Sequence, residues 1–191
     1  MSAVRQIKLV AAIGLVAIAF LGALGGLIAL NAGGAVRFGD WRALELASGY
    51  DRAAAAELAR GGRARLAQVE ARSRRATMLN PYDIGAWLRI AYVDAAAHGA
   101  LTPAGVAALA RSYDLVAYDT DQASWRIAFA LEHWGDLPPE LQAEVKAETF
   151  TLGVGWRHRL RIMEVLRGVT NPAGRMTASL WASQIESVDW R

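Results

Sequence analysis

The three histidines are the first side chains to consider for catalysis or metal binding, because the chain contains no cysteine. His98, His133 and His158 are far apart in the sequence, and the only nearby set of possible metal ligands is Glu132, His133 and Asp136. On a helix Glu132 and Asp136 share a face, whereas His133 is rotated by about 100° from Glu132. This is a weak metal-site pattern. We therefore expect a solvated helix end here and no metal site.

Other chemistry has little support in the sequence. There is no phosphate-binding glycine loop, dinucleotide-binding fingerprint, nucleophile elbow or HExxH sequence, and no pair of carboxylates stands out for acid–base catalysis. The lack of cysteine excludes disulfides, thiol catalysis and cysteine-ligated metals. We expect no enzymatic activity and no cofactor. An enzyme with side chains scattered through an all-helical pocket is the remaining alternative.

Charged residues are unevenly distributed along the chain. Residues 60–75 contain six arginines and one acid, residues 114–148 contain eight acids and two basic residues, and residues 157–161 contain three arginines. This segregation could complement a partner, or neighbouring helices could neutralise one another. The net charge of the chain is +3, of which Arg5 and Lys8 supply two units, so the rest is nearly neutral. Nucleic-acid binding is therefore disfavoured.

The N-terminal segment predicts a membrane anchor. Residues 9–36 contain no Asp, Glu, Lys, Arg or His. As a helix, Leu9 to Leu30 would be about 33 Å long, which matches the hydrocarbon core of a bilayer. Arg5 and Lys8 precede the span and predict a cytoplasmic N-terminus. A cleaved signal peptide is the alternative, but its only acceptable site, at Gly33 and Ala35, lies far beyond a signal-length apolar core.

Small and aromatic residues in and after this span suggest further contacts. Gly22 and Gly26 form a GxxxG pattern, through which a second membrane helix could approach closely. The alternative is that they reflect the general richness of such anchors in small residues. Phe38 and Trp41 follow the span, where aromatic rings favour the headgroup region.

The remainder of the chain is predicted to be all-α. Apolar residues recur with helical spacing, and no segment shows the alternation of a strand. Gly61-Gly62, His98-Gly99 and Asn171-Pro172 predict breaks, whereas Thr102-Pro103 and Pro138-Pro139 predict helix starts. We expect helices in about 42–60, 63–79, 84–97, 103–117, 122–134, 139–152, 156–166 and 173–185. Most tryptophans are expected to pack in the core between them.

A spacing of 38 residues suggests repeated helix pairs. Asp83 and Trp87 recur as Asp121 and Trp125, each at the start of an expected helix. The segment MLNPYDIGAWLRIA, residues 78–91, resembles the junction of two tetratricopeptide repeats. Departures from that family are Asp94, in place of an aromatic residue, Phe129, in place of a small residue, and a spacing longer than the usual one. The resemblance implies a degenerate repeat fold and no particular activity.

These patterns predict an adaptor in the bacterial inner membrane, with a cytoplasmic N-terminus and a periplasmic body that binds another envelope protein. The layout is similar to that of small repeat proteins accompanying surface-polysaccharide or secretion machineries. The alternative is an accessory subunit of a large integral-membrane complex, held through Gly22 and Gly26. The expected partner contacts are Arg89, Tyr92, Arg126 and Glu132. The expected divisions are a tail (1–8), a transmembrane helix (9–30), a linker (31–41), tetratricopeptide-like repeats (42–152) and a helical extension (153–191).

Overall fold

The structure is a computed structural model, which describes residues 47–188. Every regular element in this range is helical, which confirms the all-α prediction for this part of the chain. The helices are α2 (Ala47–Arg60), α3 (Arg63–Leu79), α4 (Ile84–His98), α5 (Pro103–Leu115), α6 (Ala123–Glu132), the 3-10 turn η2 (Trp134–Asp136), α7 (Pro139–Val154), α8 (Arg159–Gly168) and α9 (Pro172–Glu186).

Local sequence accounts for several helix ends. Gly61 and Gly62 have φ angles of 69° and 95°, a backbone region that favours glycine, and they separate α2 from α3. Asp83 caps α4 by accepting a hydrogen bond from the backbone N–H of Ala86 at 3.1 Å. The left-handed backbone of Gly99, with a φ of 78°, ends the same helix.

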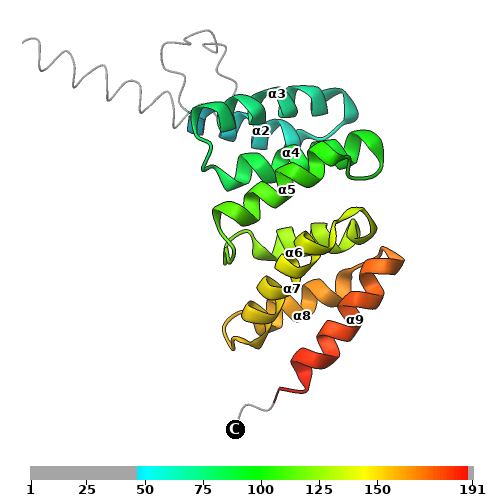
Figure 1. Cartoon of the computed structure of the whole chain (residues 1–191). Helices are drawn as coiled ribbons and strands as arrows, with labels where there is room; N and C mark the ends of the chain where they lie inside the picture. The colour runs from blue at the N-terminus through cyan, green and yellow to red at the C-terminus, as the bar shows by residue number, and fades with distance from the viewer. Residues whose placement is uncertain (1–46, 189–191) are drawn as a thin grey trace, which may run out of the picture.

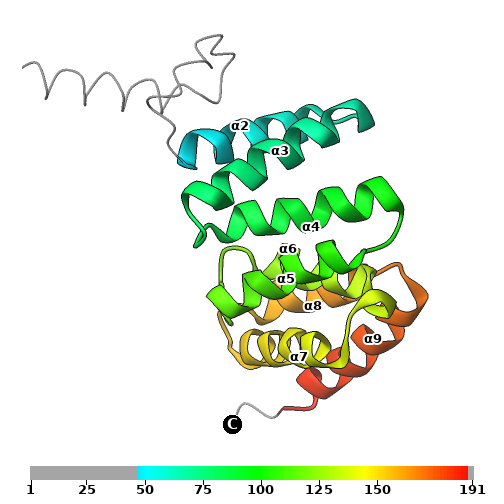
Figure 2. The same ribbon diagram turned by 45° about the horizontal axis from the view of Figure 1, so that its top comes forward.

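Successive helices are stacked into an elongated body with α2 and α3 at one end and α9 at the other (Figure 1). The closest helix packing lies within two groups. In the first, α3 packs on α2 and α4, and α4 packs on α5; in the second, α6 packs on α7, α8 and α9 (Figure 2). Large side chains join the two groups, so the hydrophobic core continues from α4 through to α9.

The expected helices are present, with corrections to their ends and faces. The helix expected to reach Trp134 ends at Glu132 and continues as the 3-10 turn. Trp156 lies ahead of α8 and is 76% exposed. Leu160 and Met176 are also exposed, because α8 buries Ile162, Met163 and Leu166 and α9 buries Gly174, Ala178, Trp181 and Ile185.

None of the helices within residues 47–188 combines the length and apolar composition needed to cross a bilayer. The predicted span 9–30 lies outside the described residues, together with Gly22, Gly26, Phe38 and Trp41. The structure therefore leaves the membrane anchor as a prediction.

Candidate functional site

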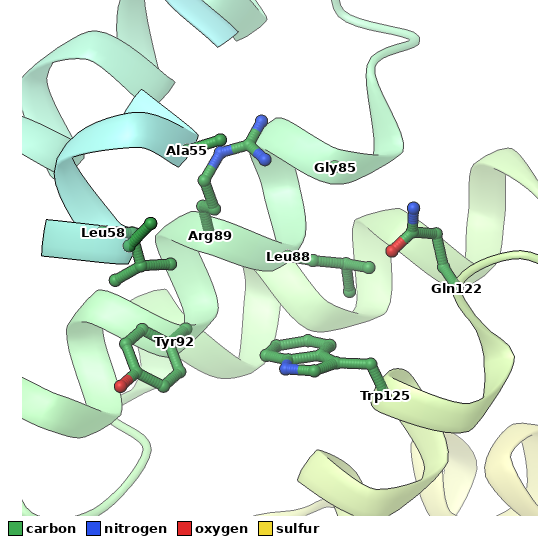
Figure 3. A pocket seen from close by; sticks show the side chains of 9 residues that line it. Ala55, Leu58, Gly85, Leu88, Arg89, Tyr92, Gln122 and Trp125 are labelled. Atoms are coloured by element: carbon green, nitrogen blue, oxygen red, sulfur yellow. The ribbon is translucent and has the colours of Figure 1, made fainter. Parts of the chain in front are cut away.

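The main candidate site is a groove between α2, α4 and the start of α6, with a volume of about 460 Å³ (Figure 3). These helices alternate along the chain with α3 and α5, which pack on α2 and α4. A second hollow of about 360 Å³ adjoins it at the α2–α3 turn, and the two share Leu58 and Tyr92. The groove is lined by Ala55, Leu58, Ala59, Gly85, Leu88, Arg89, Tyr92, Gln122 and Trp125.

Among the described residues, Arg89 is the only charged side chain that lines the larger groove, and it is largely buried, with 15% of its side chain exposed. It forms an ion pair with Asp51 of α2. Its Nε is buried and has no hydrogen-bond partner among the described residues. Burial lowers the pKa of Arg89 from its ordinary value, because the charged form is desolvated. A buried donor without a hydrogen-bond partner is unusual in a folded protein.

Two aromatic side chains, Tyr92 and Trp125, line the groove together with Arg89 (Figure 3). Trp125 stacks on Phe129 with ring centroids 4.8 Å apart and an interplanar angle of 10°. Tyr92 of α4 lies 6.4 Å from each of these two rings, so the cluster links α4 to α6. Trp125 nevertheless remains 40% exposed. An accessible aromatic ring held by other rings is a rigid contact surface that loses little entropy on binding.

The groove therefore joins apolar and aromatic surface to one desolvated cation. Comparison of the chain with models of protein families, with curated proteins and with solved structures finds no match.

Two of the four expected partner contacts lie together in this groove. Arg89 and Tyr92 are one helical turn apart on α4 and both line it. Sequence reasoning missed Leu58, Gln122 and Trp125. The sequence does contain a signal for Trp125, which lies 38 residues after Trp87 at the start of the corresponding helix of the next expected pair. The sequence interpretation nevertheless places most tryptophans in the core, whereas Trp125 is 40% exposed.

The expectation that Arg126 contacts a partner is wrong, because its side chain is fully buried. Its Nε and Nη2 donate to both oxygens of the fully buried Glu148 on α7. Its remaining donors bind the backbone carbonyls of Ser112, Val116 and Ala117, where α5 ends. Arg126 thus joins α5, α6 and α7 from inside.

Tyr113 completes this buried network. Its hydroxyl donates to Glu148 at 3.0 Å, and the guanidinium of Arg126 lies 3.8 Å from the centre of its ring. Burial, followed by the negative charge of Glu148, raises the pKa of Tyr113 well above its ordinary value of 10.0. The second oxygen of Glu148 accepts from the backbone N–H of Asp119 at 3.2 Å. All of these contacts are internal, so the network holds helices together and offers no surface.

Glu132 is also engaged within the chain. Its carboxylate accepts hydrogen bonds from the backbone N–H groups of Thr170 and Asn171 at 2.6 and 2.9 Å and from the Thr170 hydroxyl at 2.9 Å. Burial opposes ionisation, but these hydrogen bonds and the neighbouring His133 outweigh it and lower the pKa of Glu132. The contacts fix the connection between α8 and α9.

The orientation of Glu132 separates it from the other members of the weak ligand set. His133 Nδ1 lies 3.4 Å from the Asp136 carboxylate, whereas Glu132 faces α9. Within residues 47–188, no three His, Cys, Asp or Glu side chains are grouped so that they could hold a metal ion.

Proposed function

We propose that this protein is a membrane-anchored adaptor in the bacterial envelope, whose helical-repeat body binds a segment of another protein in the groove between α2, α4 and α6. The observation that carries the proposal is the groove itself, which is lined by accessible Trp125, partly buried Tyr92 and the desolvated Arg89. The first helices of successive pairs form its walls, which supports a degenerate tetratricopeptide-like arrangement.

The lining suits a polypeptide segment that offers apolar side chains and one hydrogen-bond acceptor. Leu58, Leu88 and the aromatic rings supply apolar surface, while Arg89, with 15% of its side chain exposed, is a donor for an acceptor such as a carbonyl or carboxylate oxygen. Because Asp51 already pairs with Arg89, net charge attraction in the groove is small. Shape and apolar contact should therefore contribute most of the affinity.

Trp125 provides the sharpest test of this groove, because Trp156 is a matched control. Trp156 is more exposed than Trp125 and lies outside the groove, in the turn before α8. Proteins crosslinked to the full-length chain in native membranes would be identified by mass spectrometry for wild type, Trp125→Ala and Trp156→Ala. We expect Trp125→Ala to lower the yield of the specific partner at least about tenfold, as removal of an aromatic hot spot does.

Trp156→Ala should leave that yield unchanged. Equal capture by wild type and Trp125→Ala, or an equal loss in both variants, would count against the groove. Circular dichroism of each variant would establish that the helices are intact, so that a loss of capture reports on the groove surface.

The anchor in the proposal needs a separate test. The chain has no cysteine, so single cysteines introduced before residue 9 and at an exposed position of the body give unambiguous topology labels. Extraction with alkaline carbonate should leave the full chain in the membrane fraction and release a chain that lacks residues 9–30. Release of the full chain would show that this segment is not a retained transmembrane helix.

A further inference from the structure

Three arginines converge on one carboxylate at the N-terminal end of the stack. The guanidinium groups of Arg60, Arg65 and Arg72 lie 3.0, 2.9 and 3.4 Å from the oxygens of Glu57. The carboxylate is 11% exposed, whereas the three arginine side chains are 38–45% exposed. A single negative charge compensates one guanidinium. Within residues 47–188, about two positive charges of this arginine cluster are therefore left to interact with the surroundings.

The cluster belongs to a wider separation of charge along the body. Helices α2 and α3, residues 47–79, contain seven arginines and three acids, whereas residues 80–188 contain nine basic and twelve acidic residues. Because α2 and α3 form one end of the stack, that end is positive and the remainder is negative (Figure 2). Such an asymmetry orients a molecule in the field of a charged surface.

We propose that the arginine cluster around Glu57 binds the headgroups of anionic phospholipids and holds the α2–α3 end of the body against the bilayer. A planar guanidinium can donate two parallel hydrogen bonds to a phosphate, so phosphodiester headgroups are suitable additional counterions for the cluster. The inference rests on the membrane anchor in the proposed function.

The proposed anchor is what favours a lipid surface over other polyanions. Only 16 residues separate Leu30, where the predicted span ends, from Ala47, where α2 begins. An extended chain of that length reaches at most roughly 55 Å, so the cluster would remain at a high effective concentration near the headgroups. Nucleic acid would instead have to overcome the negative charge on most of the body.

The test uses the full chain in nanodiscs, with one fluorophore on an introduced cysteine and a quencher on the lipid headgroups. Gln68→Cys places the label on the exposed side of α3, three residues after Arg65 and four before Arg72, so it shares their face. Ala143→Cys, exposed on α7, is the control position. The two lipids are pure phosphatidylcholine and phosphatidylcholine with about a third phosphatidylglycerol.

We expect quenching at position 68 to be stronger in the anionic discs and to weaken as salt is added, because exposed charges are then screened. Quenching at position 143 should be the same in both lipids. Equal quenching at position 68 in the two lipids would overturn the inference. A chain that enters neutral discs but shows no such difference would leave the anchor intact, whereas failure to enter neutral discs would contradict the anchor itself.

Two variants with opposite expected effects separate charge from structure. The double variant Arg65→Gln/Arg72→Gln should weaken the preference of the α2–α3 end for anionic over neutral discs about 25-fold, or about fivefold for each charge removed. Glu57→Gln should strengthen it about fivefold, because it removes the internal counterion of the same cluster. Both variants break Glu57 ion pairs, so a purely structural disturbance would change the preference in the same direction.

Arg111→Gln removes a positive charge from α5, outside the cluster, and should leave the preference unchanged. The inference would be overturned if the preference for anionic discs changed in the same direction in Glu57→Gln and in the double arginine variant. It would also be overturned if Arg111→Gln weakened this preference as much as the double variant does.

Discussion

Breaking the buried Arg126–Glu148 pair should destabilise the fold by about 3–5 kcal/mol, because either single substitution leaves one charge buried without its partner. Both side chains are fully buried, so no water can replace the lost contact without rearrangement. Arg126→Met also leaves the carbonyl groups of Ser112, Val116 and Ala117 without their donors and should fall at the upper end of this range. Glu148→Gln keeps an acceptor oxygen and should fall at the lower end.

The measurement is urea and thermal denaturation of the full chain in mild detergent, with unfolding monitored by circular dichroism. A loss of 3–5 kcal/mol corresponds to a melting temperature lower by roughly 6–20 °C for a protein of this size. In a double-mutant cycle built from the single variants Arg126→Met and Glu148→Leu, the double variant should cost less than the sum of those two single changes by about 1–3 kcal/mol. A loss below about 1 kcal/mol in both single variants would refute this account of the pair.

Three further predictions concern α5, α6 and α9. Gly174→Ala should cost about 1–3 kcal/mol in urea denaturation, because a Cβ there would overlap the carbonyl oxygen of Leu131; Gly168→Ala, which has no atom within 4 Å of the new Cβ, should be neutral or slightly stabilising. Glu132→Gln should lower stability at neutral pH by about 1–2 kcal/mol. Because the pKa of Glu132 in the folded protein lies below 4.5, its contribution to stability is present above that value and is lost as the pH falls through the folded pKa. The difference in stability between Glu132→Gln and wild type should therefore shrink in acid. A difference that stayed constant with pH would contradict this prediction. Tyr113, with its raised pKa, should remain protonated while the protein is folded, so its tyrosinate absorbance should appear only when alkali unfolds the chain, and stability should fall as the pH rises above about 10.

Helix ends could be predicted from the sequence where their cause lies within a few residues. The Thr102 hydroxyl accepts from the backbone N–H of Ala104 at 3.3 Å, and Asn171 accepts from Ala173 and Gly174, as their capping positions indicated. The two glycines between α2 and α3 adopt positive φ angles, as expected of a break. Such signals need no knowledge of which helices pack together.

The buried face of a helix was less predictable, because distant residues decide it. In α9, Met176 and Leu180 continue the apolar pattern, yet the helix buries Trp181, whose ring lies 5.3 Å from Trp134 and 6.1 Å from Phe150. Arg126 was expected to contact a partner, and only the placement of α7 supplies the carboxylate that allows it to be buried. Its partner is 22 residues away, beyond any local pattern.

The buried ion pair and the groove are connected through the rotation of α6. Trp125 and Arg126 are adjacent in the sequence, so their side chains point about 100° apart around the helix. Arg126 is bound by α7 and by the end of α5, which fixes that rotation and places Trp125 against Phe129 and near Tyr92 of α4. Partner capture should therefore fall in any Arg126 variant that remains folded, although Arg126 never reaches the surface. Unchanged capture by a folded Arg126→Met protein would show that the aromatic rings orient α6 without the ion pair.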